Sequence, residues 1–336
     1  MRKTFAMTAA ATLLIGTAAY AADTTLTISS YGGVYQEAQA KSYFQPFMAQ
    51  NPDIKIVEDS SSSNAKLKAM VETGNVTLDM LLTDDSFGLE PDGQWLEPID
   101  YSIVDKSKFI EGAAGTYRVA SDIEGTVLAY NAEEFGDEAP KGFADFFNTE
   151  KFPGSRAVWK YAASGIFETA LIADGVKPED LYPIDVERAL KKLDTIKSDI
   201  VWWESGSQSE QLLSSGEASM GLVWVGRAVN VAEKGIKIDW SNWTSQTGYW
   251  VVPKGTKNKE AAMKAISFFT DPAQQIEFTK YMPYGPSNKN ALKDVDAKFK
   301  GNLPTDHLDT RVMMNAEWWA ENGAKVDLRF QEWLLQ

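Results

Sequence analysis

Two adjacent carboxylates, Asp84 and Asp85, offer the plainest chemistry in this sequence. A carboxylate offsets the desolvation of a bound ammonium group, and paired carboxylates are also the acid and base of glycosidases. Glycosidase carboxylates must flank the scissile bond, which two neighbouring residues of one segment cannot do. The pair therefore favours cation binding, with Glu124 as a further candidate for that role. The alternative is that the two aspartates cap a helix that begins near Ser86.

Aromatic faces and one guanidinium are the groups that could complete such a site. The chain has 11 tryptophans, and indole rings pack against apolar ligand bodies or bind cations over their faces. Trp202-Trp203 and Trp318-Trp319 are adjacent pairs. Neighbouring side chains on a strand alternate between faces, so we expect one residue of each pair in a cleft or on the surface. Arg227 either binds a ligand carboxylate through two hydrogen bonds or forms an ion pair at the surface or at a hinge.

The composition excludes several other chemistries. The chain contains no cysteine, which excludes disulfides, thiolate nucleophiles and iron–sulfur clusters. His307 is its single histidine, so a multi-histidine metal site cannot form, and we expect no metal, no cofactor and a solvated His307. The formal net charge is −14, from 33 Lys and Arg against 47 Asp and Glu. No basic cluster that would bind a phosphate backbone is present, so we expect no nucleic-acid partner.

Short β-rich runs alternate with helical patterns along the first part of the chain. The predicted strands there are residues 26–28, 54–57 and 78–82, separated by helical patterns. This β-α-β-α-β order predicts an α/β fold with a parallel, doubly wound sheet. Ligands of such sheets bind at the carboxyl ends of the strands. Three segments follow those ends, namely 29–33, the serine run 60–64, which is otherwise a linker, and 83–86.

After a further strand at 126–131 the pattern restarts. The later part of the chain has predicted strands at 157–159, 218–224 and 250–252, and predicted helices at 186–196, 208–215 and 259–270. At 336 residues the chain is long enough for two cores. The sequence therefore predicts two α/β domains.

The first residues have the pattern of an export signal. A basic start is followed by an apolar stretch from Phe5 to about Tyr20, which ends in a small-x-small motif at Ala21. We therefore expect residues 1–21 to be a signal peptide cleaved near Ala21. A membrane anchor is the alternative, but the stretch is shorter than the roughly 20 strongly apolar residues that a span needs. With no cysteine for lipid attachment, the expected location is the periplasm of a Gram-negative bacterium, without a membrane anchor.

Six segments of the chain carry a family resemblance. They are residues 30–33, 64–68, 78–82, 216–227, 252–262 and 283–288, and with the stretches between them they cover essentially the whole chain after the export signal. In this order they resemble the periplasmic solute-binding proteins of ABC importers, specifically the spermidine/putrescine-binding branch. The resemblance implies a two-lobed, type II-like periplasmic binding protein fold, with a doubly wound sheet in each lobe and a ligand cleft between the lobes. It implies that lobe one is 24–128 plus 248–293 and that lobe two is 129–247 plus 294–336.

The function implied by this resemblance is that of a receptor without catalytic activity. It would be a monomer that closes around a small organic amine, amino acid-like or polyamine-like solute and is then presented to the membrane permease of an importer. Two alternatives remain open, a secreted glycosidase-type hydrolase that uses carboxylates and a solute sensor for a chemoreceptor.

The family's ligand positions correspond only in part to residues of this chain. By the resemblance, two aromatic positions fall on Tyr31 and Trp224, while two family acids fall on Ala162 and Gly248. A diamine would therefore lack a partner for its second ammonium group. We expect instead a ligand with one cationic nitrogen and, if Arg227 faces the cleft, a carboxylate.

The candidate ligand-binding residues combine both lines of reasoning. Gln246 and Trp319 are added because they occupy two further ligand positions of the family. The full set is Tyr31, Asp84, Asp85, Ser86, Glu124, Trp202, Trp203, Trp224, Arg227, Gln246 and Trp319.

Overall fold

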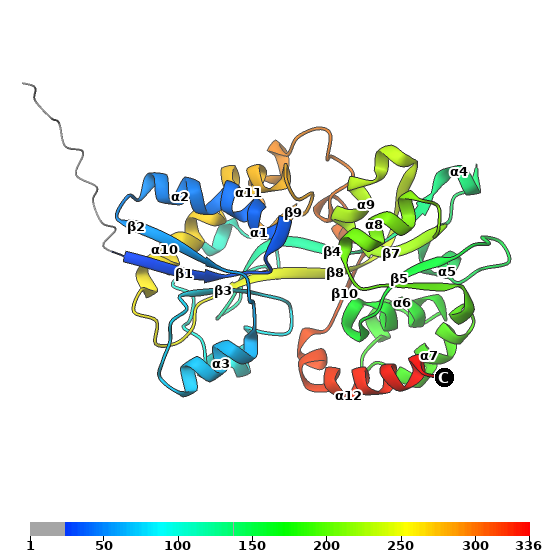
Figure 1. Ribbon diagram of the computed structural model, residues 1–336, viewed down its shortest axis with the longest axis horizontal. Coiled ribbons are helices and arrows are strands. Elements are labelled where there is room, and N and C mark those ends of the chain that lie inside the picture. The colour runs from blue at the N-terminus through cyan, green and yellow to red at the C-terminus, as the bar shows by residue number, and fades with distance from the viewer. Residues whose placement is uncertain (1–23, 137) are drawn as a thin grey trace, which may run out of the picture.

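The computed structural model describes residues 24–136 and 138–336, which form two lobes side by side (Figure 1). The expected signal peptide lies outside the described residues. One sheet runs through both lobes, and its strand order is β2-β1-β3-β8-β4-β7-β5-β6, with β9 and β10 attached to β4 and β8. The strands are β1 Thr24–Ser29, β2 Ile54–Asp59, β3 Met80–Thr83, β4 Val119–Asn131, β5 Arg156–Trp159, β6 Ile200–Trp203, β7 Met220–Trp224, β8 Ile236–Val251, β9 Gly285–Pro286 and β10 Arg311–Met313.

Lobe one, as the term is used below, comprises β1 to β3 and the helices packed on them. Its helices are α1 Gly33–Gln39, a π-helical turn Ala40–Phe44, α2 Gln45–Gln50, α3 Asn64–Glu72, α10 Lys259–Phe269 and α11 Pro272–Thr279. β1 pairs in parallel with β2 and β3, as the sequence predicted. Helices α1, α2 and α11 cover one face of the sheet and α3 covers the other (Figure 1). The core between them includes the stacked rings of Tyr43 and Phe269, whose centroids lie 5.5 Å apart.

Lobe two comprises β5 to β7 and the remaining helices. These are α4 Ala132–Phe135, α5 Gly142–Phe146, α6 Ile166–Ala173, α7 Val186–Asp194, α8 Gly206–Ser214, α9 Val225–Asn230 and α12 Ala316–Leu334. β5 pairs in parallel with β6 and with β7. Helices α8 and α9 cover one face, and α6, α7 and α12 cover the other (Figure 1). The core of this lobe is a separate cluster of buried apolar residues that includes Phe146, Phe167, Leu190 and Trp333.

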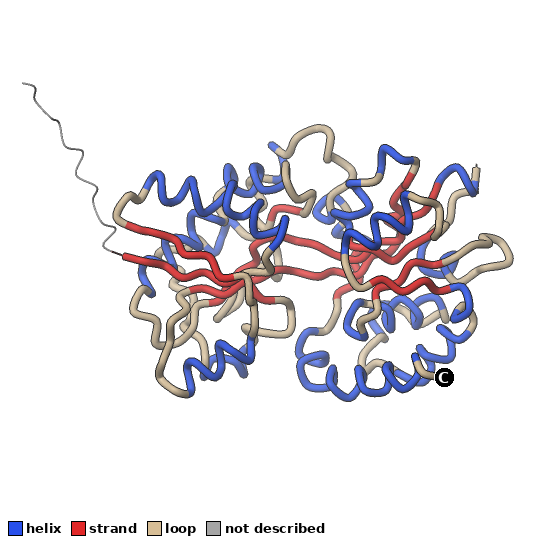
Figure 2. Tube along the Cα trace, in the orientation of Figure 1, coloured by secondary structure: helices blue, strands red, loops and turns tan. Residues whose placement is uncertain are grey.

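Two long antiparallel strands, β4 and β8, join the lobes (Figure 2). β8 pairs with β3 in lobe one, and β4 pairs with β7 in lobe two. A third connection, residues 287–310, runs from β9 on β4 to β10 on β8. The two half-sheets are thus one continuous mixed sheet, whereas a separate sheet in each lobe was expected.

Strand β8 is much longer than the 250–252 run that the sequence indicated. Its 16 residues include a central stretch, 237–246, in which polar residues alternate irregularly with tryptophans. That stretch crosses between the lobes, where neither face of the strand is uniformly buried. The regular alternation of apolar and polar residues that marks a strand in a sequence is therefore lost. Among the described residues, no helix has the length and apolar character that crossing a membrane requires.

Candidate functional site

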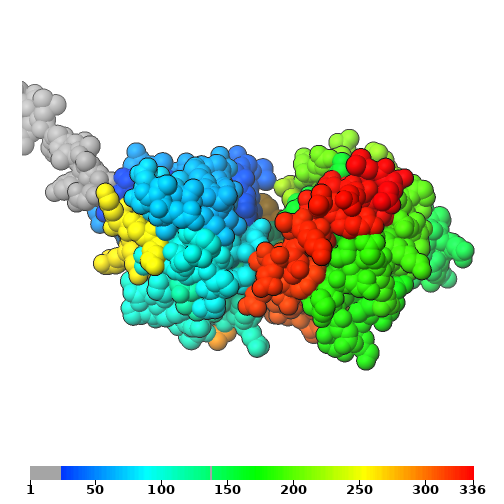
Figure 3. Space-filling model, turned by 90° about the horizontal axis from the view of Figure 1, so that it is seen from below, coloured from blue at the N-terminus to red at the C-terminus, as the bar shows by residue number. Residues whose placement is uncertain are grey.

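A cavity of about 540 Å³ lies between the lobes. In the space-filling view the molecular surface is indented where lobe one meets the C-terminal residues of lobe two (Figure 3). Nine of the eleven residues predicted from the sequence line this cavity, namely Tyr31, Asp84, Asp85, Ser86, Glu124, Trp224, Arg227, Gln246 and Trp319. Further lining residues that the sequence did not single out include Tyr35, Trp159, Tyr161, Thr247, Met282 and Tyr284.

The ends of the strands place these side chains, as expected for an α/β sheet. Tyr31 follows β1, Asp84 to Ser86 follow β3, and Trp224 is the last residue of β7. Glu124 and Gln246 face each other in the register of β4 and β8, where the chain passes from one lobe to the other. The cavity is therefore built from both lobes and from the strands that connect them.

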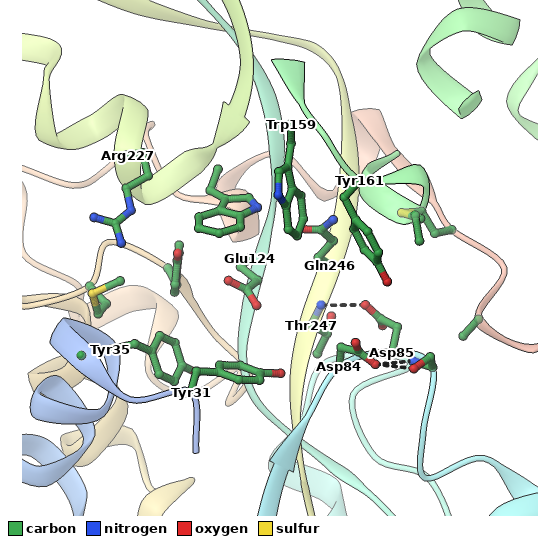
Figure 4. Close-up of a pocket in the computed structure, with 18 of the residues that line it drawn as sticks. Tyr31, Tyr35, Asp84, Asp85, Glu124, Trp159, Tyr161, Arg227, Gln246 and Thr247 are labelled. Atoms are coloured by element: carbon green, nitrogen blue, oxygen red, sulfur yellow. Dashed lines mark hydrogen bonds between the residues drawn. The ribbon is translucent and has the colours of Figure 1, made fainter. Parts of the chain in front are cut away.

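The aspartate pair does not cap a helix, because no helix begins at Ser86. Asp84 Oδ1 accepts hydrogen bonds from the backbone N–H of Ser86 at 3.0 Å and from its hydroxyl at 2.5 Å. Asp85 Oδ2 accepts from the backbone N–H of Thr247 on β8 at 2.9 Å (Figure 4). Asp85 thus fastens the end of β3 to a connecting strand while its carboxyl stays on the cavity wall.

The carboxyls in and behind this wall are poorly solvated. Burial raises the pKa of Asp85 to about 7, although the nearby Arg118 acts to lower it. Burial raises the pKa of Asp122, behind the wall, to about 6, and Tyr35 donates a hydrogen bond of 2.5 Å to it. Burial, followed by repulsion from Asp122 and Asp85, raises the pKa of Glu124. A cation in the cavity would favour the ionised forms of these groups.

Arg227, on α9, supplies positive charge on the lobe-two side of the cavity. Its Nη1 lies 3.0 Å from Glu210 Oε1. In the described part of the chain, no hydrogen bond engages its Nη2. Gly206 leaves room for the guanidinium, since a Cβ there would collide with Arg227 Nε. Glu210 therefore holds one terminal nitrogen of a guanidinium whose residue also lines the cavity.

The aromatic wall differs from the expectation about Trp202 and Trp203, neither of which lines the cavity. Trp203 is fully buried and stacks on Trp159 with 5.5 Å between ring centroids and 7° between planes. Trp202 points the other way and packs edge-on against Phe330 of α12. Protein covers both faces of β6. Because side chains alternate between the two faces of a strand, Trp203 packs into the core on one face and Trp202 packs into the core on the other. Trp159, on the neighbouring strand β5, lines the cavity instead.

The serine run and His307 also differ from expectation. The run does not line the cavity, and Ser62 Oγ instead donates to the carbonyl of Leu82 at 2.6 Å. His307 is partly buried and stacks on Trp240 with 4.2 Å between ring centroids. In residues 24–136 and 138–336, no group of three or more potential ligands is placed to hold a metal ion.

Trp319 is held in the wall by a buried carboxyl of lobe two. Its Nε1 donates to Glu168 Oε1 at 2.7 Å, and the Tyr182 hydroxyl donates to the same oxygen. Burial raises the pKa of Glu168. Since the indole N–H is engaged away from the cavity, Trp319 offers a ligand mainly its ring.

Comparison with known proteins adds to this geometry. The profile of the family described as bacterial extracellular solute-binding protein matches residues 42–305. A gamma-aminobutyric acid-binding protein of Pseudomonas aeruginosa is 35% identical over 334 residues, which are 96% of this chain and 94% of that protein. The solved structure of a GABA receptor has a TM-score of 0.87 and 38% identity, covering 92% of this chain and 97% of that one. A spermidine/putrescine-binding periplasmic protein of Escherichia coli is 25% identical over 59% of this chain and 57% of its own length.

Proposed function

We propose, from the premise that this chain belongs to the bacterial extracellular solute-binding proteins, that it is the receptor of an ABC importer for a small zwitterion. The ligand class is that of ω-amino acids, of which 4-aminobutanoate (GABA) is the reference compound. Two relatives that cover nearly the whole chain carry GABA in their names, which supports this ligand class. The sequence had already pointed to one cationic nitrogen and a possible carboxylate.

One observation carries the choice of a zwitterion: the cavity has opposite charges at its two sides. In Figure 4 Arg227 lies at one side, and Asp84 and Asp85 lie at the other, with Glu124 between them. The rings of Tyr31, Trp159 and Tyr161 lie around the same space. An ammonium group beside the carboxyls and a carboxylate at Arg227 would both be paired, and the methylenes between them would contact rings.

A diamine fits this arrangement less well. The acidic residues that line the cavity are Asp84, Asp85 and Glu124, none of which comes from β5 to β7 or their helices. Ala162 is buried in lobe two, and Gly248 lies on β8 opposite Asp122. The second ammonium of putrescine would therefore meet Arg227 or indole rings, and repulsion from Arg227 would oppose binding.

Binding of the zwitterion is coupled to closure of the lobes in this proposal. Tyr31, at 43% exposed, and Val34, at 56%, line the cavity from lobe one, and Tyr161, at 43%, lines it from lobe two. A ligand that contacts both lobes stabilises the closed arrangement, in which these apolar surfaces are covered. The permease of the importer would then distinguish the closed, loaded receptor from the open one.

The remaining features of the proposal follow the sequence analysis. The receptor acts in the periplasm as a monomer after removal of residues 1–21, and it returns its ligand chemically unchanged. Its lobes are divided near 128/129, 247/248 and 293/294. These divisions fall within or beside β4, β8 and the third connection.

Binding and scattering measurements test this function together. We expect calorimetry to give one 4-aminobutanoate per chain and small-angle scattering to show a smaller radius of gyration with ligand than without. At 100 times its dissociation constant the ligand should add about 2.7 kcal/mol to the unfolding free energy. Putrescine and a neutral sugar are the comparison ligands for both measurements. Tight putrescine binding, a sugar as the sole ligand, or conversion of 4-aminobutanoate to a product would each refute the proposal.

A further inference from the structure

We propose that Tyr284 is a specificity-determining residue, whose hydroxyl stands between Glu124 and Arg227 and prevents these opposite charges from pairing with each other. The inference rests on the proposed function, because only a ligand with two opposite charges needs both groups free. The sequence analysis did not single out Tyr284 as a binding residue.

The backbone fixes Tyr284 beside the connecting strand β4. The antiparallel register pairs Ile123 with Gly285 and Asp122 with Pro286. Continuing this register by one residue brings Tyr284 next to Glu124. Its backbone N–H donates to the carbonyl of Met282 at 2.7 Å, which holds the turn before β9.

The ring of Tyr284 is enclosed between the two lobes. The residue is 3% exposed, and its ring centroid lies 6.2 Å from that of Tyr35 in lobe one. On the lobe-two side it lies against Gly226, where a Cβ would be 2.9 Å from Tyr284 Cε1. Because Gly226 directly precedes Arg227, the missing side chain lets the ring approach the backbone that carries the guanidinium.

The charges around the hydroxyl agree with this placement. Burial raises the pKa of Tyr284, Glu124 raises it further and Arg227 lowers it, so the hydroxyl stays neutral. All three residues line the same cavity. Hydrogen bonding with Tyr284 acts to lower the pKa of Glu124. A hydroxyl can donate to a carboxylate and still offer lone pairs to a guanidinium. In the described part of the chain, Arg227 forms its ion pair with Glu210 and not with Glu124.

Loss of this separation would affect both ends of a zwitterion. If the hydroxyl is removed, the guanidinium and the Glu124 carboxylate can approach and neutralise each other. The ligand carboxylate then competes with Glu124 for Arg227, and the ligand ammonium competes with Arg227 for Glu124. A monocation such as butylamine has no carboxylate to lose, so its affinity should fall less.

The test is the ratio of two affinities, measured by calorimetry on the full mature chain. We expect Tyr284→Phe to lower the ratio of 4-aminobutanoate to butylamine affinity about tenfold. Gly226→Ala displaces the ring without deleting the hydroxyl and should lower the same ratio, and alanine is favourable in helix α9. Tyr281→Phe is the matched control, because Tyr281 is 45% exposed and does not line the cavity. Its ratio should equal that of the wild type.

The outcomes separate this inference from the function on which it rests. A role in packing alone would weaken both ligands by one factor, and an unchanged ratio in both Tyr284→Phe and Gly226→Ala would overturn the inference while the proposed function stands. A wild type that does not prefer 4-aminobutanoate to butylamine would refute the proposed function and this inference with it. Thermal unfolding shows whether each variant folds. If either Tyr284→Phe or Gly226→Ala fails to fold, the other of these two variants decides.

Discussion

Replacing Arg227 by methionine is expected to weaken 4-aminobutanoate binding by about 100-fold, which corresponds to ~2.7 kcal/mol. The substitution keeps an unbranched side chain of similar length and removes a guanidinium from the lining of the cavity. A carboxylate that has left water would then have no charged partner. Isothermal titration calorimetry at neutral pH measures the change.

Two comparisons make this result specific to the carboxylate. Arg188→Met removes the same charge from α7 of lobe two, where Arg188 pairs with Asp174 outside the cavity, and should leave the affinity within twofold. Butylamine should bind Arg227→Met at least as well as it binds the wild type. A similar loss for 4-aminobutanoate and butylamine in Arg227→Met would mean that Arg227 supports the fold and not the ligand.

Affinity for 4-aminobutanoate is expected to fall about 50-fold between pH 7 and pH 5, because a carboxyl with a pKa of about 7 is half ionised at pH 7 and about 1% ionised at pH 5. The ligand ammonium binds the ionised form of Asp85, whose pKa of about 7 in the empty cavity reflects burial. Below that pKa the affinity falls about tenfold for each pH unit, because the proton must leave Asp85 before the ligand ammonium binds. Calorimetry in buffers of different ionisation enthalpy should also show proton release on binding near pH 7.

The same pKa has a consequence for the ligand-free protein, with the opposite sign. Between the ordinary value of 3.8 and about 7, the folded chain holds a proton on Asp85 that the unfolded chain has lost. The unfolding free energy of the empty receptor should therefore decrease as the pH rises through that window. Asp85→Asn should flatten both profiles, whereas Asp53→Asn, at an exposed position before β2, should leave them unchanged. An unaltered pH profile in Asp85→Asn would assign the proton to another carboxyl.

Much of the architecture could be predicted from the sequence, because local patterns and turn residues determine it. The apolar runs of β1, β2 and β3 and the helices between them implied a parallel sheet, and such a sheet fixes the edge at which ligands bind. That rule predicts that Tyr31, Asp84 and Asp85 lie close together at this edge of the sheet. The family resemblance added Trp224, Gln246 and Trp319, which also line the cavity.

Other parts of the site depend on packing that no local pattern records. Trp159 and Trp203 are paired in the register of β5 and β6 and share one face of the sheet, and only the order of the strands decides which one lies at the cavity. Tyr284 is adjacent to Glu124 through the pairing of β9 with β4, a contact between residues far apart in the chain. Gly206 leaves room for Arg227, and Gly226 leaves room for Tyr284. The local sequence does not indicate which side chains lie against these two glycines.

The crystal structure of the mature receptor with 4-aminobutanoate tests the central claim most directly. The account predicts one ligand in the cavity between the lobes, with its carboxylate hydrogen-bonded to Arg227 and its ammonium facing Glu124 and Asp85. The methylenes should contact the rings of Trp159 and Trp224. A ligand bound in the reverse orientation, or one whose carboxylate does not contact Arg227, would contradict the account.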